Sequence, residues 1–150
     1  MTLSLSLSTE HKVDPKMLSP LTLAFLGDTV FDLFVRKMLV CEANRPANKL
    51  HRLSVERVCA AAQASAAKEL LESDFLTEEE RTVLRRGRNA HSNHLPKNAS
   101  EWDYHMATGL EALFGYLYLC EDAQRLSALF AEVCRIFDQD KKENATTDER

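Results

Sequence analysis

An aspartate, Asp28, stands in a stretch from Pro20 to Phe31 that is otherwise almost entirely apolar. If this stretch is a helix with 3.6 residues per turn, the side chains one and two turns away are mostly hydrophobic. They are Leu21, Ala24, Phe25, Phe31, Asp32 and Val35. An ionised carboxylate on such a face needs a cation, a metal ion or several hydrogen-bond donors, or its pKa must rise until it is neutral. The alternative is a structural aspartate that reaches solvent at a groove or bonds the end of a neighbouring helix.

A second carboxylate, Glu111, has similar surroundings between Ala107 and Tyr118. Small residues recur around both acids at intervals of three, as Gly109, Ala112 and Gly115 in one stretch and as Ala24 and Gly27 in the other. Glycine inside a helix costs about 1 kcal/mol relative to alanine, so this spacing indicates two helices that cross with their backbones close together. We therefore expect the crossing to bring Asp28 and Glu111 together.

Two carboxylates at short range, without an arginine or lysine between them, repel each other. Either one of them is protonated or a divalent cation lies between them. Oxygen ligands suit Mg²⁺ or Mn²⁺, which in enzymes polarise a phosphoryl oxygen and lower the pKa of a bound water. The pattern thus predicts a metal site formed by Asp28 and Glu111, while a protonated pair, or two acids at distant helix ends, would fit it too. Asp32, one turn from Asp28, could assist a metal through water or be a surface or interface acid.

Basic residues gather in two places, although the net charge of the chain is -4. The stretch from Arg81 to Ser100 has five of them and no acid, and the stretch from Arg45 to Arg57 has four against Glu56 alone. Such local patches can attract nucleic acid even on an acidic protein, because the distribution of charge matters more than the net charge. The alternative for the cluster around Arg85 is a solvated helix end whose cations complement the helix dipole.

The elements that must position these residues are helices. Four Gly and four Pro in 150 residues, with 7% aromatic content, favour long uninterrupted helices in one all-α domain. Cap signals at Ser19, Thr77 and Ser100 mark helix starts. We expect helices over 20–39, 50–71, 77–87, 102–120 and 122–137 in a domain spanning 14–137, with an N-terminal extension over 1–13 and a charged, disordered tail over 138–150. The first helix is apolar on more than one side, so it is central or shared with a second subunit.

Other classes of site and location are excluded by what the sequence lacks. The four cysteines are widely spaced, which indicates neither a zinc site nor a disulfide framework. The N-terminus has no basic segment followed by an apolar run, and no stretch of about 18 apolar residues occurs. We therefore expect a cytoplasmic protein with reduced cysteines.

Three motifs resemble one known family. The stretch from Leu23 to Val30 resembles the signature helix of ribonuclease III catalytic domains, and the stretch from Thr108 to Gly115 resembles their second acidic motif. Between them, the stretch from Arg85 to Ala90 and the pair Lys97-Asn98 are similar to the Mini-ribonuclease III subfamily. The resemblance covers residues 14–137. It implies a single helical ribonuclease III-type catalytic domain, without the double-stranded-RNA-binding domain of the larger enzymes.

The sequence departs from the larger family at two acidic positions. Ala24 and Thr108 stand where that family has Glu and Asp. The subfamily that the sequence resembles also lacks these two acids. The resemblance therefore assigns catalytic and metal-binding roles to Asp28 and Glu111 only. It does not imply a fully occupied two-metal site.

The activity that the resemblance implies is Mg²⁺-dependent hydrolysis of double-stranded RNA by a homodimer, with Mn²⁺ as a substitute metal. The products have 5′-phosphate and 3′-hydroxyl ends, and the subfamily's usual substrate is the precursor of large-subunit (23S) ribosomal RNA. RNA duplexes are recognised mainly through backbone and 2′-hydroxyl contacts. The expected RNA-binding residues are first Arg85, Arg86, Arg88, Lys97 and Asn98, and second Lys49, His51 and Arg52. Two alternatives are a non-catalytic module that binds structured RNA and an unrelated phosphohydrolase that acts on free nucleotides.

Overall fold

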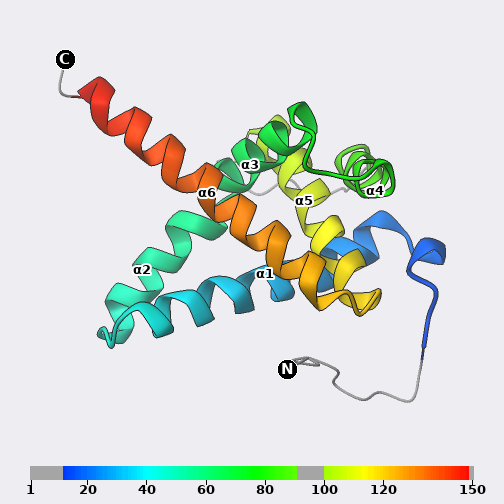
Figure 1. Ribbon diagram of the computed structural model, residues 1–150, viewed down its shortest axis with the longest axis horizontal. Helices are drawn as coiled ribbons and strands as arrows, with labels where there is room; N and C mark the ends of the chain where they lie inside the picture. Colours follow the sequence, from blue (N-terminus) through cyan, green and yellow to red (C-terminus); the bar gives the residue numbers. More distant parts are fainter. Residues whose placement is uncertain (1–11, 91–99, 149–150) are drawn as a thin grey trace.

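The computed structural model describes residues 12–90 and 100–148, and within these it contains helices and no strand. A short 3₁₀ helix, η1, precedes six α-helices (Figure 1). Their bounds are η1 Pro15–Met17, α1 Pro20–Glu42, α2 Ala47–Val58, α3 Ala60–Glu72, α4 Glu78–Arg88, α5 Glu101–Leu119 and α6 Ala123–Asp148. The all-α prediction is confirmed. No described helix is both long and apolar enough to cross a membrane.

The predicted caps begin the helices where expected. The side chain of Ser19 accepts a hydrogen bond from the backbone of Thr22, and Pro20 occupies the first turn of α1. Thr77 and Glu80 form a complete capping box at the start of α4. Ser100 accepts from the backbone of Asp103 at the start of α5. These local signals decided the helix starts because each satisfies backbone N–H groups that the helix itself leaves unpaired.

Helix α5 is the centre of the domain, and α1 crosses it at two glycines. A methyl group on Gly27 would overlap the carbonyl oxygen of Glu111, and one on Gly115 would overlap the carbonyl oxygen of Leu23. The predicted close crossing of the two helices is therefore confirmed. Because the contact is between backbones, no side chain separates the helix that carries Asp28 from the one that carries Glu111.

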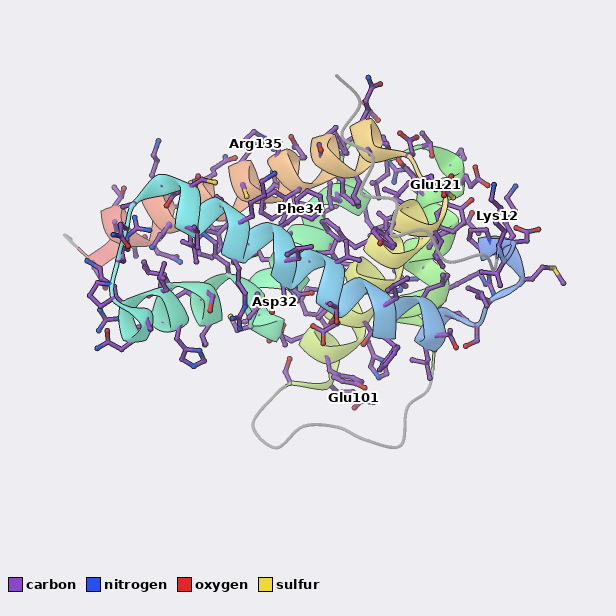
Figure 2. The ribbon with its side chains drawn as sticks, turned by 90° about the horizontal axis from the view of Figure 1, so that it is seen from below. Lys12, Asp32, Phe34, Glu101, Glu121 and Arg135 are labelled. Atoms are coloured by element: carbon purple, nitrogen blue, oxygen red, sulfur yellow. The ribbon has the colours of Figure 1, made fainter. Side chains whose placement is uncertain are left out.

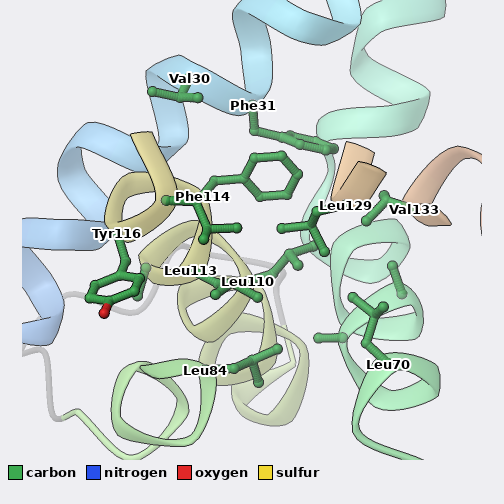
Figure 3. Packing of buried hydrophobic residues seen from close by; sticks show 14 of the residues in the cluster. Val30, Phe31, Leu70, Leu84, Leu110, Leu113, Phe114, Tyr116, Leu129 and Val133 are labelled. Carbon is green, nitrogen blue, oxygen red and sulfur yellow. The ribbon is translucent and has the colours of Figure 1, made fainter. Parts of the chain in front are cut away.

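Two further surfaces of α5 are covered by other helices. On one side α4 packs closely, since a Cβ on Gly87 would lie 2.8 Å from the Cα of Gly109. On another side lies the apolar core, where Phe31 meets Phe114 with ring centroids 5.1 Å apart. Figure 3 shows this cluster between α1, α3, α5 and α6. Its largest fully buried members include Leu70, Leu84, Leu110, Leu113, Phe114, Leu129 and Ile136.

The helix expected over 50–71 is two helices, so that prediction is wrong in one respect. The chain breaks at Cys59, whose backbone is extended with φ -65° and ψ 152°. The side chain of Gln63 donates a 2.9 Å hydrogen bond to the carbonyl of Val58 at this break. The physical reason is tertiary: α2 packs on α1, whereas α3 packs on α5 and α6, and one straight helix could not do both.

The tail expected to be disordered from residue 138 is instead helical as far as Asp148. Three contacts hold its first turn to the preceding helices. Asp138 pairs with Arg57 at 3.2 Å, Asp140 accepts a hydrogen bond from Ser65, and Lys141 pairs with Glu56 at 3.5 Å. Helix α6 therefore continues beyond Ile136, its last buried residue, because polar contacts hold the added turns to the preceding helices.

Candidate catalytic site

Asp28 and Glu111 come together where α1 crosses α5. Asp28 is exposed and Glu111 is partly buried, and the two side chains interact by hydrogen bond and by charge. Burial, followed by the charge of Asp28, raises the pKa of Glu111 from 4.5 to about 8. At neutral pH the pair therefore shares one proton when no cation is present. The sequence left two possibilities for such a pair, a bound divalent cation or a protonated carboxyl group.

No positively charged side chain among the described residues is paired with either acid. Within residues 12–90 and 100–148, neither Asp28 nor Glu111 forms an ion pair with a lysine, arginine or histidine. The same described residues contain no cluster of three or more His, Cys, Asp or Glu side chains that could enclose a metal. Two carboxylate ligands still fit Mg²⁺, which usually keeps several waters and takes its other ligands from a substrate phosphate.

The two positions that lack an acid, Ala24 and Thr108, lie one turn from Asp28 and Glu111 and supply no carboxylate. Ala24 and Thr108 are both buried. The hydroxyl of Thr108 donates a 2.8 Å hydrogen bond to the carbonyl of Tyr104 one turn earlier, so its proton is already committed to the helix backbone. Asp32 accepts a 3.0 Å hydrogen bond from Arg36 on the outer side of α1. That ion pair makes Asp32 a surface acid in the described structure.

The basic cluster of α4 lies at the end of the helix that packs beside Glu111. Arg85 and Arg86 are exposed, and Arg88 is half-buried with its Nε donating to Asn89. The contact of Gly87 with α5 sets the position of these cations relative to Glu111. Arg81 differs from them, because it donates hydrogen bonds to the carbonyls of Leu71 and Ser73 and so joins α4 to the end of α3. Lys97 and Asn98 lie outside the described residues.

The second basic group, on α2, lies far from the first. Figure 1 places α2 and α4 at opposite ends of the molecule, and Figure 2 shows the same separation. Lys49, His51 and Arg52 are exposed on α2. Its flanking arginines have structural partners: Arg45 donates to the carbonyl of Leu39, and Arg57 binds Asp138 and lies 4.4 Å from the ring centroid of Phe137. The structure therefore does not bring the two basic groups together within one chain.

Two features lie outside the residues predicted to form the site. One is an apolar face of α1 made by Leu21, Phe25, Leu33 and Val40, of which Phe25 is 83% exposed. Figure 2 looks onto α1, which crosses the near side of the molecule uncovered by the other helices. The other is a hydrogen-bonded group of Lys16, Glu79 and Tyr116 beside α4. The apolar breadth of the first helix signalled the former, and no sequence pattern signalled the latter.

Comparison with known proteins agrees with the resemblance. Residues 21–122 match the family described as the ribonuclease III domain. The Mini-ribonuclease 3 of Thermoanaerobacter sp. is 49% identical over 109 residues, which are 73% of this chain and 75% of that protein. The Mini-ribonuclease 3 of Staphylococcus aureus is 40% identical over 124 residues, or 83% of this chain and 92% of that protein.

A solved structure also has the same fold. The crystal structure of a Fusobacterium nucleatum protein superposes with a TM-score of 0.72 at 27% identity, covering 83% of this chain and 98% of that one. The family match spans both Asp28 and Glu111, together with the α4 cluster. The chain therefore belongs to the ribonuclease III family of endoribonucleases that act on double-stranded RNA.

Proposed function

We propose that Asp28 and Glu111 hold a catalytic Mg²⁺ with which this chain hydrolyses phosphodiester bonds in double-stranded RNA. The observation that carries the proposal is the pairing of these two acids without a basic partner among the described residues, with the pKa of Glu111 raised to about 8. A divalent cation can take the place of the proton that such a carboxyl pair otherwise holds. Enzymes of the family supply the precedent for the substrate.

Each residue of the pair has a distinct part in binding. Asp28 is exposed and offers its carboxyl group to solvent and substrate. Glu111 is partly buried and must release its proton before it can act as a ligand. When bound, Mg²⁺ would polarise a phosphoryl oxygen and lower the pKa of an attacking water. The backbone contact of Gly27 with Glu111 holds the two carboxylates in place, which is what a positioned ligand pair requires.

The RNA contacts are proposed on the basic surface of α4. Arg85, Arg86 and Arg88 stand next to the helix that carries Glu111, so a duplex bound there would pass the carboxylates. Lys97 and Asn98 follow on the same chain and are proposed to contact the same duplex. Lys49, His51 and Arg52 on α2 would contact a more distant part of the RNA or a second region of it.

The exposed apolar face of α1 is proposed as the surface of a homodimer. Exposed apolar side chains favour association in water, and Phe25 lies one turn from Asp28 on the same helix. A two-fold pair would place one carboxylate centre in each subunit, and the two centres would cut opposite strands to leave 5′-phosphate and 3′-hydroxyl ends. The natural substrate would be the 23S ribosomal RNA precursor in the cytoplasm, as the subfamily resemblance implies.

The test is cleavage of a long RNA duplex with and without Mg²⁺. We expect Asp28→Asn to reduce the rate by roughly 100-fold or more, because one of two metal ligands is lost. Asp74→Asn is the matched control, since Asp74 is an exposed acid on the segment between α3 and α4. Equal cutting by wild type and Asp28→Asn would refute the assignment of the site. Duplex binding without any cutting by the wild type would favour a non-catalytic RNA-binding module instead.

A further inference from the structure

A pocket of about 300 Å³ lies beside helices α1, α4 and α5, and of its lining residues only Arg86 has a part in the function proposed above. Four elements build it: η1, the first turn of α1, the middle of α4 and the end of α5. Leu23, in its wall, is also the residue whose carbonyl touches Gly115 at the crossing of α1 and α5. The pocket is thus one helical turn away from the contact that positions Glu111.

The inner part of the pocket is apolar. Leu23, Val83 and Tyr116 line it, and all three side chains are buried. The ring of Tyr116 lies at the edge of the core, and Figure 3 shows its hydroxyl pointing away from Leu113 and Leu110. An aromatic ring and two aliphatic side chains form an apolar surface against which a nucleobase can pack.

The rim of the pocket is polar and carries more positive than negative charge. Lys16 and Arg86 stand there against a single acid, Glu79. Among the described residues Arg86 forms no ion pair, so its guanidinium is available to a phosphate. Glu79 has one oxygen occupied, because its Oε1 accepts from Lys16 at 2.9 Å and from Tyr116 at 2.7 Å.

We propose that this pocket binds one nucleotide, with its base on the apolar inner wall and its phosphate at the cations of the rim. The volume lies at the lower end of the range for small-ligand pockets, which fits a single nucleotide and no larger ligand. The second oxygen of Glu79 accepts no hydrogen bond from the described residues and would receive one from a base N–H. The occupant is either a free nucleoside 5′-monophosphate or the 5′-phosphorylated end of an RNA strand.

Binding of a 5′-phosphorylated RNA end rests on the proposed nuclease function, because cleavage would generate such ends. Binding of a free nucleoside 5′-monophosphate does not rest on it, so nucleotide binding must be measured apart from catalysis. The experiment is calorimetric titration of the full chain with each nucleoside 5′-monophosphate in the presence of EDTA, which removes metal-mediated binding at Asp28 and Glu111. Inorganic phosphate and unphosphorylated nucleosides are titrated in parallel. A 5′-phosphorylated RNA trinucleotide then distinguishes the two sources by whether it competes for the site.

Two variants test the location of the site. Thr82→Trp places an indole at the mouth of the pocket from an exposed position on α4, and we expect it to abolish nucleotide binding. Arg86→Gln should weaken nucleotide binding by roughly tenfold or more, because a charge-assisted contact to phosphate is lost. Arg85→Gln is the matched control, since Arg85 is the adjacent exposed arginine and does not line the pocket. Circular dichroism melting curves verify that each variant is folded.

Each outcome of these titrations either supports or overturns the proposed nucleotide site. Nucleotide binding that is lost in Thr82→Trp, weakened in Arg86→Gln and kept in Arg85→Gln supports the proposal, and competition by the trinucleotide only identifies the source. Absence of saturable binding to the wild type overturns it, as does unchanged binding by Thr82→Trp. Phosphate that binds as tightly as the nucleotides also overturns it, because the base would then contribute nothing. Duplex cleavage in Mg²⁺ is scored separately, so failure of one proposal leaves the other to its own test.

Discussion

Replacing Glu111 by glutamine should change how the stability of the metal-free protein depends on pH. In the folded chain the pKa of Glu111 is raised from 4.5 to about 8, chiefly by burial and then by Asp28. The folded state therefore binds more protons than the unfolded state between these two pH values. Because stability falls with rising pH wherever the folded state holds the extra proton, the contribution of Glu111 is fully present below pH 4.5 and is lost as the pH rises through 8.

The size of the effect follows from the same shift. At about 1.4 kcal/mol for each pH unit, the interval from 4.5 to about 8 corresponds to a loss of at most about 5 kcal/mol in the free energy of unfolding. Glutamine keeps the shape of the side chain and does not titrate, so Glu111→Gln should lack this loss. Asp28→Asn removes the neighbouring charge but leaves the burial, and it should show an intermediate pH dependence.

Urea unfolding of wild type and both variants at one protein concentration, in EDTA and at several values between pH 5 and 9, provides the measurement. The quantity of interest is the difference between variant and wild type at each pH, because other titrating groups cancel in it. We expect Glu111→Gln to gain stability relative to wild type as the pH rises. Differences that stay constant across this range would refute the assignment of a shared proton to the pair. Addition of Mg²⁺ to the wild type should reduce the pH dependence, because the metal replaces that proton.

Two other predictions concern helix α1. Gly27→Ala should lower the free energy of unfolding by roughly 3 kcal/mol or more, because the new methyl group overlaps the backbone of Glu111 and must separate α1 from α5. The measurement is urea denaturation, and Thr29→Ala, on the exposed side of the same helix, is the control. Phe25→Asp should convert the proposed homodimer to a monomer in sedimentation equilibrium, because an aspartate would remove the most exposed apolar side chain of the proposed interface. Its helical circular dichroism should stay unchanged, because Phe25 is 83% exposed and lies outside the core. A Phe25→Asp protein that remains dimeric would show that α1 is not the dimer surface.

Features set by local chemistry could be predicted from the sequence. The caps at Ser19, Thr77 and Ser100 involve residues three positions apart, so the pattern alone contains the whole interaction. The crossing of α1 and α5 could be predicted because glycine destabilises a helix interior, and a close approach of a second backbone offsets that cost. From that crossing followed the pairing of Asp28 with Glu111.

Features set by distant contacts could not be predicted in this way. The break at Cys59 lies in a segment with good helix formers on its C-terminal side, and only the different packing partners of α2 and α3 require it. Arg81 has the same residue type as its basic neighbours, yet its hydrogen bonds to the end of α3 make it structural. The helical tail likewise depends on Arg57 and Ser65, which are far away in the sequence.

The glycine contacts along α5 fix the distance between the proposed RNA-binding arginines of α4 and the proposed catalytic carboxylates. Gly109 meets α4, which carries the basic surface, and Gly115 meets α1, which carries Asp28, so both neighbours are held at backbone distance on either side of Glu111. Backbone contacts have no rotamers and do not shift when a nearby side chain changes. The core of this domain can therefore exchange one apolar residue for another over evolutionary time while the spacing from the arginines to the carboxylates stays constant.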